Sequence, residues 1–122
     1  MSYRHLIQQA VENNLIEMEW GQLSWLVNSE LMQEAESTFG VVTILPGKRN
    51  PYHLHPNCEE VLYVLSGTCD HKIGDETYPL QPGDVICIPK GVKHYAFCTS
   101  QEPLKAVISF SSPDRETFFI ED

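Results

Sequence analysis

Most of the chain alternates apolar and polar residues with a period of two. This alternation is the pattern of strands that turn one face to a core and the other to solvent. The runs are short, and turns containing glycine or proline separate them. We expect strands at 38–46, 51–55, 60–66, 68–73, 76–80, 84–89, 92–98, 104–111 and 116–120. Many short strands between tight turns predict an all-β sandwich or barrel.

The run 60–66 differs from the others because both of its faces are apolar. Leu62 and Val64 alternate onto one face, and Tyr63 and Leu65 alternate onto the other. A strand that is apolar on both sides is typically covered on both sides. We therefore expect 60–66 to be buried on both faces.

The first 28 residues carry two different patterns. The apolar residues of 3–15 are spaced as on one face of a helix, which predicts a short N-terminal amphipathic α-helix. Residues 16–28 then alternate around Trp20 and Trp25, with a shift of phase at Gly21 of the kind that a bulge produces. This stretch predicts two short strands or one bulged strand. The two tryptophans favour a place in the core or at an interface over a role as a substrate platform.

Length and composition indicate a single structural domain. The chain has 122 residues, of which 42% are hydrophobic and 20% charged, enough for one core but not for two. We expect residues 1–35 to form a helix and a β extension that packs on the barrel or on a dimer partner, and residues 36–122 to form the barrel. The predicted helix and the tryptophan-containing stretch offer a surface for a homodimer.

Charge and targeting signals narrow the function classes. The net charge is -9, and only eight Lys and Arg are present, so the basic footprint of a nucleic-acid-binding protein is missing. No apolar run approaches the ~20 residues that span a bilayer. The first residues show no signal-peptide pattern, so we expect a cytoplasmic protein with no membrane partner. The four cysteines form no C-x-x-C pair, and reduced, buried thiols are expected.

The candidate chemistry lies between residues 47 and 67. His53 and His55 are two residues apart, so on an extended chain their side chains point to the same side. A carboxylate that returns to that side on the next strand would complete three converging ligands. Imidazole and carboxylate together suit Fe, Mn, Ni, Co or Zn. Glu60 shares its face with Leu62 and is the favoured carboxylate, whereas Glu59 has the opposite phase, and Cys58 is a weaker competitor.

The spacing of these residues and of a second stretch resembles the two signature motifs of the cupin family. The first motif is matched by Gly47, His53, His55, Glu60 and Gly67, and the second by Gly83, Pro89, Gly91, His94 and Cys98. The resemblance implies a double-stranded β-helix, or jelly-roll barrel. It also implies one divalent transition metal (Fe, Mn, Ni or Zn) bound by His53, His55, Glu60 and His94.

One position departs from the family pattern. Cys98 stands where cupins usually have Asn, and its thiol could change the hydrogen bonding around the site or be sensitive to oxidation. That position is not a usual ligand, so metal binding is still expected. His5 and His71 have no partner in the motifs and are interpreted as ordinary polar positions.

Two functions are compatible with this reading. The first is a metal-dependent enzyme acting on a small oxygenated substrate, such as a sugar or carboxylate derivative, by isomerase, lyase, decarboxylase or dioxygenase chemistry. The second is a non-catalytic module that binds a small molecule and acts with a separate partner. Candidate helper residues are Tyr63 and Tyr95 as acid or base, Arg49 and Lys93 as anion anchors, and Cys98. Tyr95 and Lys93 are out of phase with His94 and are expected to face away from the metal.

Overall fold

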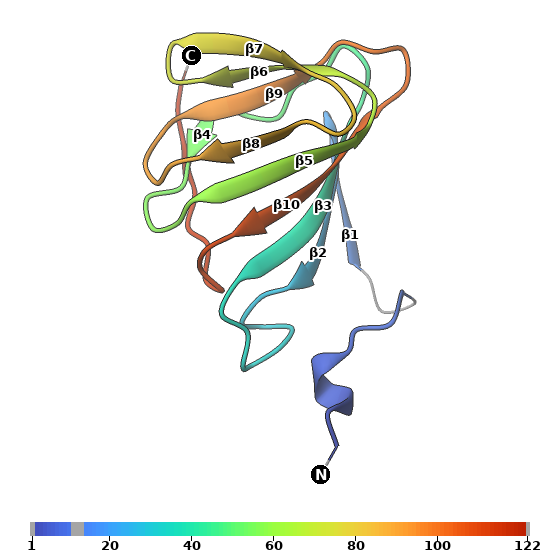
Figure 1. The fold of residues 1–122 in the computed structure, drawn as a ribbon, viewed down its shortest axis with the longest axis vertical. Coiled ribbons are helices and arrows are strands. Elements are labelled where there is room, and N and C mark those ends of the chain that lie inside the picture. The colour runs from blue at the N-terminus through green and yellow to red at the C-terminus, as the bar shows by residue number, and fades with distance from the viewer. Residues whose placement is uncertain (1, 11–13, 122) are drawn as a thin grey trace.

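The computed structural model describes residues 2–10 and 14–121, which form an almost entirely β structure (Figure 1). Its strands are β1 (Asn14–Met18), β2 (Gly21–Val27), β3 (Thr38–Ile44), β4 (His53–Leu54), β5 (Glu60–Ser66), β6 (Cys69–Ile73), β7 (Glu76–Leu80), β8 (Val85–Ile88), β9 (His94–Cys98), β10 (Leu104–Phe110) and β11 (Phe118–Phe119). The strands predicted from 38 onward are all present. The shortest are β4 and β11, where the ligand-bearing loop and the C-terminal segment pair over two residues.

The strands form two antiparallel sheets. One has six strands in the order β1-β2-β3-β10-β5-β8, and the other has five in the order β11-β4-β9-β6-β7. Neighbours that are distant in sequence, such as β3 and β10, are joined by crossovers that close the sheets into the barrel seen in Figure 1. This arrangement confirms the predicted all-β jelly-roll class.

The core lies where the inward faces of the two sheets meet. Along β10, Leu104, Ala106, Ile108 and Phe110 are buried in strict alternation, as the period of two predicts. Their partners include Val64 of β5, which is fully buried. The apolar alternation of the sequence therefore builds the wall that faces the candidate site.

The prediction that 60–66 is buried on both faces is wrong for the chain as described. Leu62 and Val64 point into the core, but Tyr63 and Leu65 on the opposite face are 44% and 46% exposed. Val85, the partner of Tyr63 on β8, is also exposed. The outer face of this sheet is apolar, yet none of the described segments covers it. The period of two shows which side chains share a face and whether that face is apolar, but it does not show whether another segment covers the face.

The stretch 16–28 contributes to two strands rather than to one bulged strand. β1 and β2 form an antiparallel hairpin, and β2 pairs with β3, so the hairpin extends the six-stranded sheet. Gly21 opens β2 where the backbone passes close to β3: a Cβ atom built there would lie 1.9 Å from the Thr43 carbonyl oxygen. The phase shift at Gly21 is thus a turn with a close approach between backbones.

The predicted N-terminal α-helix is replaced by one 3-10 turn at Arg4–Leu6. Part of the predicted helix, 11–13, lies outside the described residues, and Leu15 belongs to β1. Leu6 and Ile7 are 40% and 56% exposed, so their apolar faces meet no wall of the barrel. A short helix in water is marginal without such packing, which explains why helical spacing alone did not produce one. In Figure 1 this segment extends away from the barrel.

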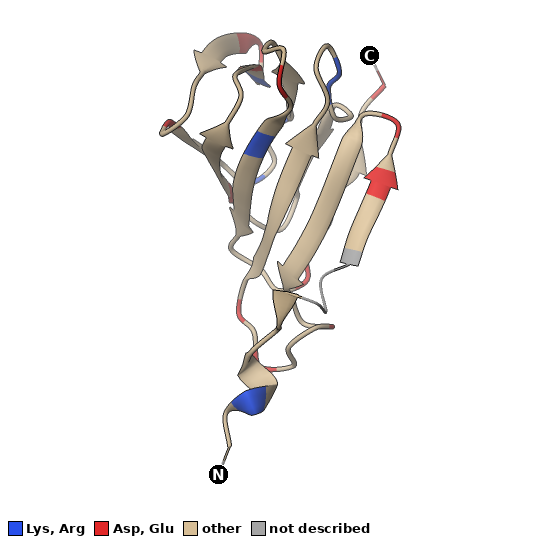
Figure 2. Cartoon of the chain, turned by 90° about the vertical axis from the view of Figure 1, so that its right-hand side faces the viewer, with Lys and Arg blue, Asp and Glu red and all other residues tan. Residues whose placement is uncertain are grey.

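The charged residues are dispersed over the molecule. In Figure 2 the Lys and Arg positions are spread over several elements and loops, with acidic positions between them. Within the described residues, no helix is long and apolar enough to cross a membrane.

Candidate metal centre

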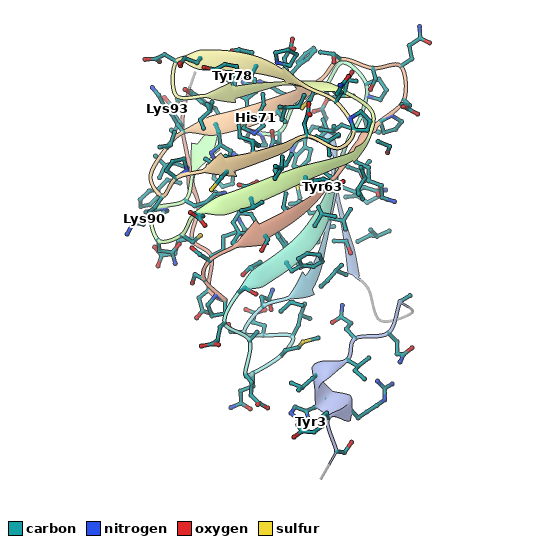
Figure 3. All side chains as sticks on the ribbon, viewed as in Figure 1. Tyr3, Tyr63, His71, Tyr78, Lys90 and Lys93 are labelled. Carbon is teal, nitrogen blue, oxygen red and sulfur yellow. The ribbon has the colours of Figure 1, made fainter. Side chains whose placement is uncertain are left out.

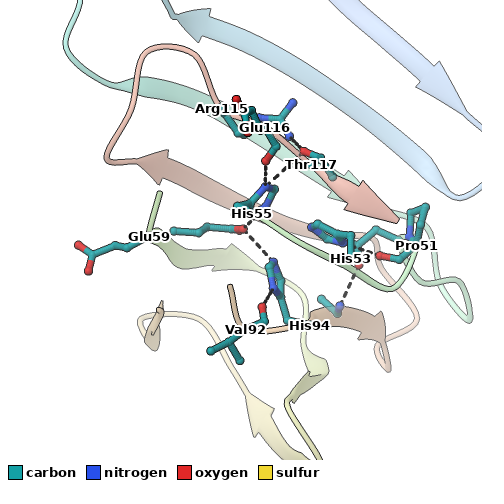
Figure 4. Close-up of polar contacts among 12 residues, drawn as sticks. Pro51, His53, His55, Glu59, Val92, His94, Arg115, Glu116 and Thr117 are labelled. Atoms are coloured by element: carbon teal, nitrogen blue, oxygen red, sulfur yellow. Dashed lines mark hydrogen bonds and ion pairs between the residues drawn. The ribbon is translucent and has the colours of Figure 1, made fainter. Parts of the chain in front are cut away.

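Four side chains from three segments meet inside the barrel (Figure 4). His53 is on β4, His55 follows that strand, Glu60 opens β5, and His94 opens β9. His53 and His94 are direct partners across the β4–β9 pair, which brings the two sequence motifs together. One ligand atom from each of the four residues lies within 4.8 Å of the others, and all four side chains are buried. The sequence predicted this set, and the structure brings it together.

Hydrogen bonds fix the orientation of every imidazole. The Nδ1 atom of His53 donates to the Pro51 carbonyl oxygen at 2.5 Å. His55 Nδ1 donates to the carbonyl of Glu116 at 2.9 Å, and His94 Nδ1 donates to the carbonyl of Val92 at 2.9 Å. On the other side of the rings, the Nε2 atoms of His55 and His94 lie 3.1 and 3.0 Å from Glu60 Oε1.

These backbone contacts determine which nitrogen carries the proton. A carbonyl oxygen can only accept a hydrogen bond, so each Nδ1 is protonated, and in a neutral ring Nε2 presents a lone pair. The lone pairs of His55 and His94 then face an oxygen of Glu60. A lone pair and a carboxylate oxygen repel each other unless each ring is protonated or a cation lies between them. A divalent metal removes the repulsion without extra protons, so these ligand atoms fit a metal ion.

The electrostatics of the group point the same way. Burial alone would raise the pKa of Glu60, but hydrogen bonds to His55 and His94 outweigh it, and the pKa lies below its ordinary range. For His53, burial is the main cause that lowers the pKa to about 4, and the neighbouring His94 adds to it. A carboxylate and a neutral imidazole are the forms in which these side chains bind metals.

The competing ligands from the same segment do not join the group. Glu59 is exposed and points away from the imidazoles in Figure 4. Cys58 is buried in the apolar core cluster, where burial raises the pKa of its thiol. A protonated thiol is a poor metal ligand. The choice of Glu60 from its phase on the strand therefore agrees with the structure.

A cavity of about 520 Å³ opens beside the four residues. At one end its wall is polar and contains His53, His55 and Glu60, with Arg115 and Thr117 close by. The rest is mainly apolar, with Ile16, Met18, Trp20, Trp25, Phe110 and Phe119 among the lining residues. The two tryptophans pack against the core, as expected, and they also face this cavity.

None of the predicted helper residues lines this cavity. Tyr63 lies on the outer face of β5, and Lys93 is exposed on the barrel surface (Figure 3). The guanidinium of Arg49 lies 4.3 Å from the ring centre of Tyr95, beside a separate surface hollow. The expected outward position of Tyr95 and Lys93 thus agrees with the structure.

Cys98 lies away from the ligands as well. It is buried at the far end of β9 from His94, and its sulfur is 3.5 Å from the Glu102 carbonyl oxygen. Cys98 is paired across the strands with Cys69, whose pKa burial raises to about 12. The contacts of Cys98 give it no place in the hydrogen bonding of the ligand set.

Two residues at the site escaped the sequence reasoning. His71 was interpreted as an ordinary polar position, but it is 1% exposed and stacks on His94 with ring centres 5.9 Å apart. His71 follows Cys69 by two residues on one strand, so the two side chains share a face. Because Cys69 was expected to be buried, this spacing could have predicted that His71 is buried too. Arg115 lies beyond the last clear strand, in a turn-like stretch. Nothing in its spacing predicts that it returns to the cavity.

Comparison with known proteins supports these observations. The family model described as "Cupin domain" matches residues 40–110. The chain is 40% identical over 55 residues to Protein SchB of Streptomyces halstedii, covering 45% of this chain and 40% of the relative. It is 28% identical over 91 residues to Polyketide synthase CurC of Streptomyces cyaneus, covering 75% of this chain and 59% of the relative.

The fold is also similar to solved structures. A structure concerned with the Mn(II) centres of Bacillus subtilis oxalate decarboxylase superposes with a TM-score of 0.83 and 26% identity, covering 90% of this chain and 30% of that one. The chain therefore spans less than two thirds of each of these similar proteins. Their whole-protein activities go beyond what the shared region shows.

Proposed function

The chain belongs to the cupin family, and from that premise we propose that it is a metal-dependent enzyme acting on a small oxygenated substrate. It is a cupin domain whose group of three histidines and one glutamate can hold a metal. The metal would be a divalent transition ion bound by His53, His55, Glu60 and His94. Mn is supported by the oxalate decarboxylase neighbour, and Fe, Ni and Zn suit the same donors.

The observation that carries the proposal is the cavity that reaches the ligands. A purely structural metal site is closed by its protein ligands, whereas a catalytic site keeps positions open. Here three of the four proposed ligands line a cavity of about 520 Å³, within the size range of small-molecule sites. When bound, the metal would supply Lewis-acid stabilisation of negative charge on a carbonyl, enolate or carboxylate oxygen.

The chain's own residues would hold the donors in place during such chemistry. The carbonyl of Glu116 keeps His55 in one orientation, and the carbonyl of Val92 does the same for His94. Neither ring has to turn when a substrate enters, so no reorganisation opposes binding. The apolar side chains in the wall offer water no hydrogen bonds, and electrostatic interactions are stronger beside such a wall than in bulk water.

The substrate named for the solved neighbour is not carried over. Oxalate consists of two joined carboxylates and has no apolar surface, whereas most of this cavity wall is apolar. A substrate with an apolar body and an oxygen-bearing end suits the cavity better. The relative named a polyketide synthase supports a substrate of that larger kind. Isomerase, lyase, decarboxylase and dioxygenase reactions remain the proposed range.

Metal analysis tests the proposal first. We would purify the protein without an affinity tag or chelator and measure bound metals by mass spectrometry, beside His94→Ala. The expected result is about one metal ion per chain in the wild type and almost none in the variant. His5→Ala is the matched control, because His5 is exposed and its Nε2 contacts Glu34. Its metal content should equal that of the wild type.

The identity of the metal then selects the activity assay. Iron would lead to oxygen-uptake measurements, and manganese or zinc to screens for isomerases and lyases. Turnover that disappears on chelation and returns with the metal supports the enzyme. Ligand binding without turnover supports the non-catalytic module. If neither protein holds metal after reconstitution, the proposal is wrong.

A further inference from the structure

Among the residues that the structure describes, Arg115 is the one arginine or lysine that lines the cavity. It lies in the segment that follows β10, and it lines the cavity together with His53, His55 and Glu60. Its guanidinium carbon is 4.4 Å from the ring centre of Trp25 and 5.3 Å from that of Phe110. In Figure 4 this segment lies beside His55. A cation, two aromatic faces and the proposed metal ligands thus share one space.

The guanidinium has few polar partners. Arg115 Nη1 donates to Thr117 Oγ1 at 2.6 Å, which uses one of its five N–H groups. Among the residues that the structure describes, no carboxylate lies within ion-pair distance of it. Burial lowers the pKa of Arg115, while the charge of Glu60 opposes that shift. An arginine stays protonated in proteins, so this partly desolvated cation has no counter-ion in direct contact.

An anion in the cavity would supply that counter-ion. A guanidinium forms paired, charge-assisted hydrogen bonds with a carboxylate, whose planar shape matches its own. The rest of the wall limits the body of the ligand. Trp20, Trp25 and Phe119 offer aromatic surfaces, and Ile16 and Ile108 offer aliphatic ones. Flat conjugated groups pack well against such walls.

We propose that Arg115 is a specificity-determining residue that binds the carboxylate of an aromatic or otherwise flat, apolar monocarboxylic acid in the cavity beside the four ligands. This inference rests on the proposed function, because it takes the cavity to be the substrate site. It names the substrate class: substrates would be selected by a single anionic group and by an apolar body.

A purely structural role for Arg115 predicts different behaviour. Through Thr117, whose Oγ1 lies 3.3 Å from His55 Nδ1, Arg115 also supports the segment that orients His55. If support were its only task, substitution would disturb metal binding and would weaken charged and neutral ligands equally. If Arg115 binds a carboxylate, substitution weakens charged ligands selectively and leaves the metal in place.

The test compares an acid with its neutral isostere. Binding of 2-naphthoate and of 2-naphthamide is measured by titration calorimetry on the wild type, Arg115→Gln and Arg115→Lys. For the wild type we expect the acid to bind at least about tenfold more tightly than the amide. Arg115→Gln should weaken the acid by about tenfold to a hundredfold and change the amide by less than about twofold. The affinity of Arg115→Lys for the acid should lie between those of the wild type and Arg115→Gln, because lysine keeps the positive charge but cannot form the paired hydrogen bonds of a guanidinium.

Two controls separate Arg115 from the metal and from general charge effects. Arg4→Gln makes the same charge change in the exposed 3-10 turn and should leave both affinities unchanged. The titrations are repeated on chelated protein, where the preference for the acid should persist in the wild type and be absent in Arg115→Gln. Metal content is measured on every variant and should not change.

Three results would overturn the inference. One is an equal loss of acid and amide in Arg115→Gln, and another is a preference for the acid that chelation abolishes. The third is failure of the wild type to bind 2-naphthoate at all. The first and third results do not depend on the metal content of the wild type, and the second applies only where the wild type holds metal. The proposed function therefore stands or falls separately, on the metal analysis. If Arg115→Gln does not fold, Arg115→Lys carries the comparison.

Discussion

At one end of the cavity the side chains are oriented by hydrogen bonds, and at the other they are held mainly by packing. The polar end consists of His53, His55 and Glu60, with His94 behind them, and three backbone carbonyls fix the rings. The apolar end is formed largely by the β1–β2 hairpin and the C-terminal segment. Trp25 there packs edge-on against Phe110, with ring centres 5.9 Å apart.

The two ends also differ in their relation to the family. The matched region, 40–110, contains all four proposed ligands. Trp20, Trp25 and Arg115 lie outside that region, yet they line the same cavity. The four proposed ligands therefore lie within the region that the family model matches, whereas Arg115, which we propose selects the ligand, lies outside it. A fold that hosts many functions can vary its substrate in this way.

The largest effect is expected from breaking the polar end at Glu60. Glu60→Gln keeps the shape of the side chain but removes the negative charge that faces His55 and His94. We expect metal affinity to fall by about a hundredfold or more, since even indirect partners of a ligand contribute tenfold to a hundredfold. Competition with a chromophoric chelator measures the change. Glu59→Gln, the exposed neighbour, is the matched control, and equal losses in both variants would contradict the assignment.

A smaller effect is expected from breaking the apolar end at Trp25. Trp25→Ala removes the contacts with Phe110 and Arg115, and the free energy of unfolding should fall by about 2 to 3 kcal/mol because the side chain is only partly buried. Metal content should stay at the wild-type level, because no proposed ligand touches Trp25 through a hydrogen bond. Urea denaturation and metal analysis on the same samples give both values.

The conservative variant sharpens this comparison. Trp25→Phe keeps an aromatic face for the guanidinium of Arg115 and should recover more than half of the lost stability. Loss of metal from folded Trp25→Ala would show that the two ends are coupled. In that case the ligand set and the residues around Trp25 could not be treated as independent.

The ligand set could be predicted from the sequence, and the place of Arg115 could not. Residues two apart on a strand share a face by geometry, so His53 and His55 were paired without a structure. The phase of Glu60 against Glu59 followed from the same rule. Arg115 reaches the cavity because a turn after β10 brings the chain back, and local periodicity holds no information about such a return.

The errors of the sequence analysis have one physical origin. Leu6 and Ile7 have helical spacing and Tyr63 has strand spacing, and in each case the apolar face was assumed to be covered. Periodicity describes one surface, whereas burial needs a second surface that only the tertiary arrangement provides. His71 shows the converse case. Its side chain was interpreted as an ordinary polar position, but its strand phase places it in the core.

The smallest effect is expected at His71, which shares the five-stranded sheet with His94 and lies outside the ligand set. Its Nδ1 is buried without a hydrogen-bond partner, and its pKa is lowered to about 4, mainly by burial and also by His94. The unfolded chain, with an ordinary value of 6.5, takes up the proton first as the pH falls. The stability that neutral His71 contributes is therefore complete above pH 6.5 and is lost as the pH falls toward 4.

Between pH 7 and pH 5, the free energy of unfolding of the chelated wild type should accordingly fall by about 2 kcal/mol more than that of chelated His71→Leu. At pH 7 the substitution itself should change stability by less than about 1 kcal/mol, because the ring leaves no hydrogen-bonded partner behind. Urea denaturation at the two pH values measures both quantities. His5→Leu, at an exposed position, should keep the full wild-type loss. If His71→Leu loses as much stability as the wild type, the acid sensitivity belongs to the ligand set. His71 would then contribute only packing to the core beside the site.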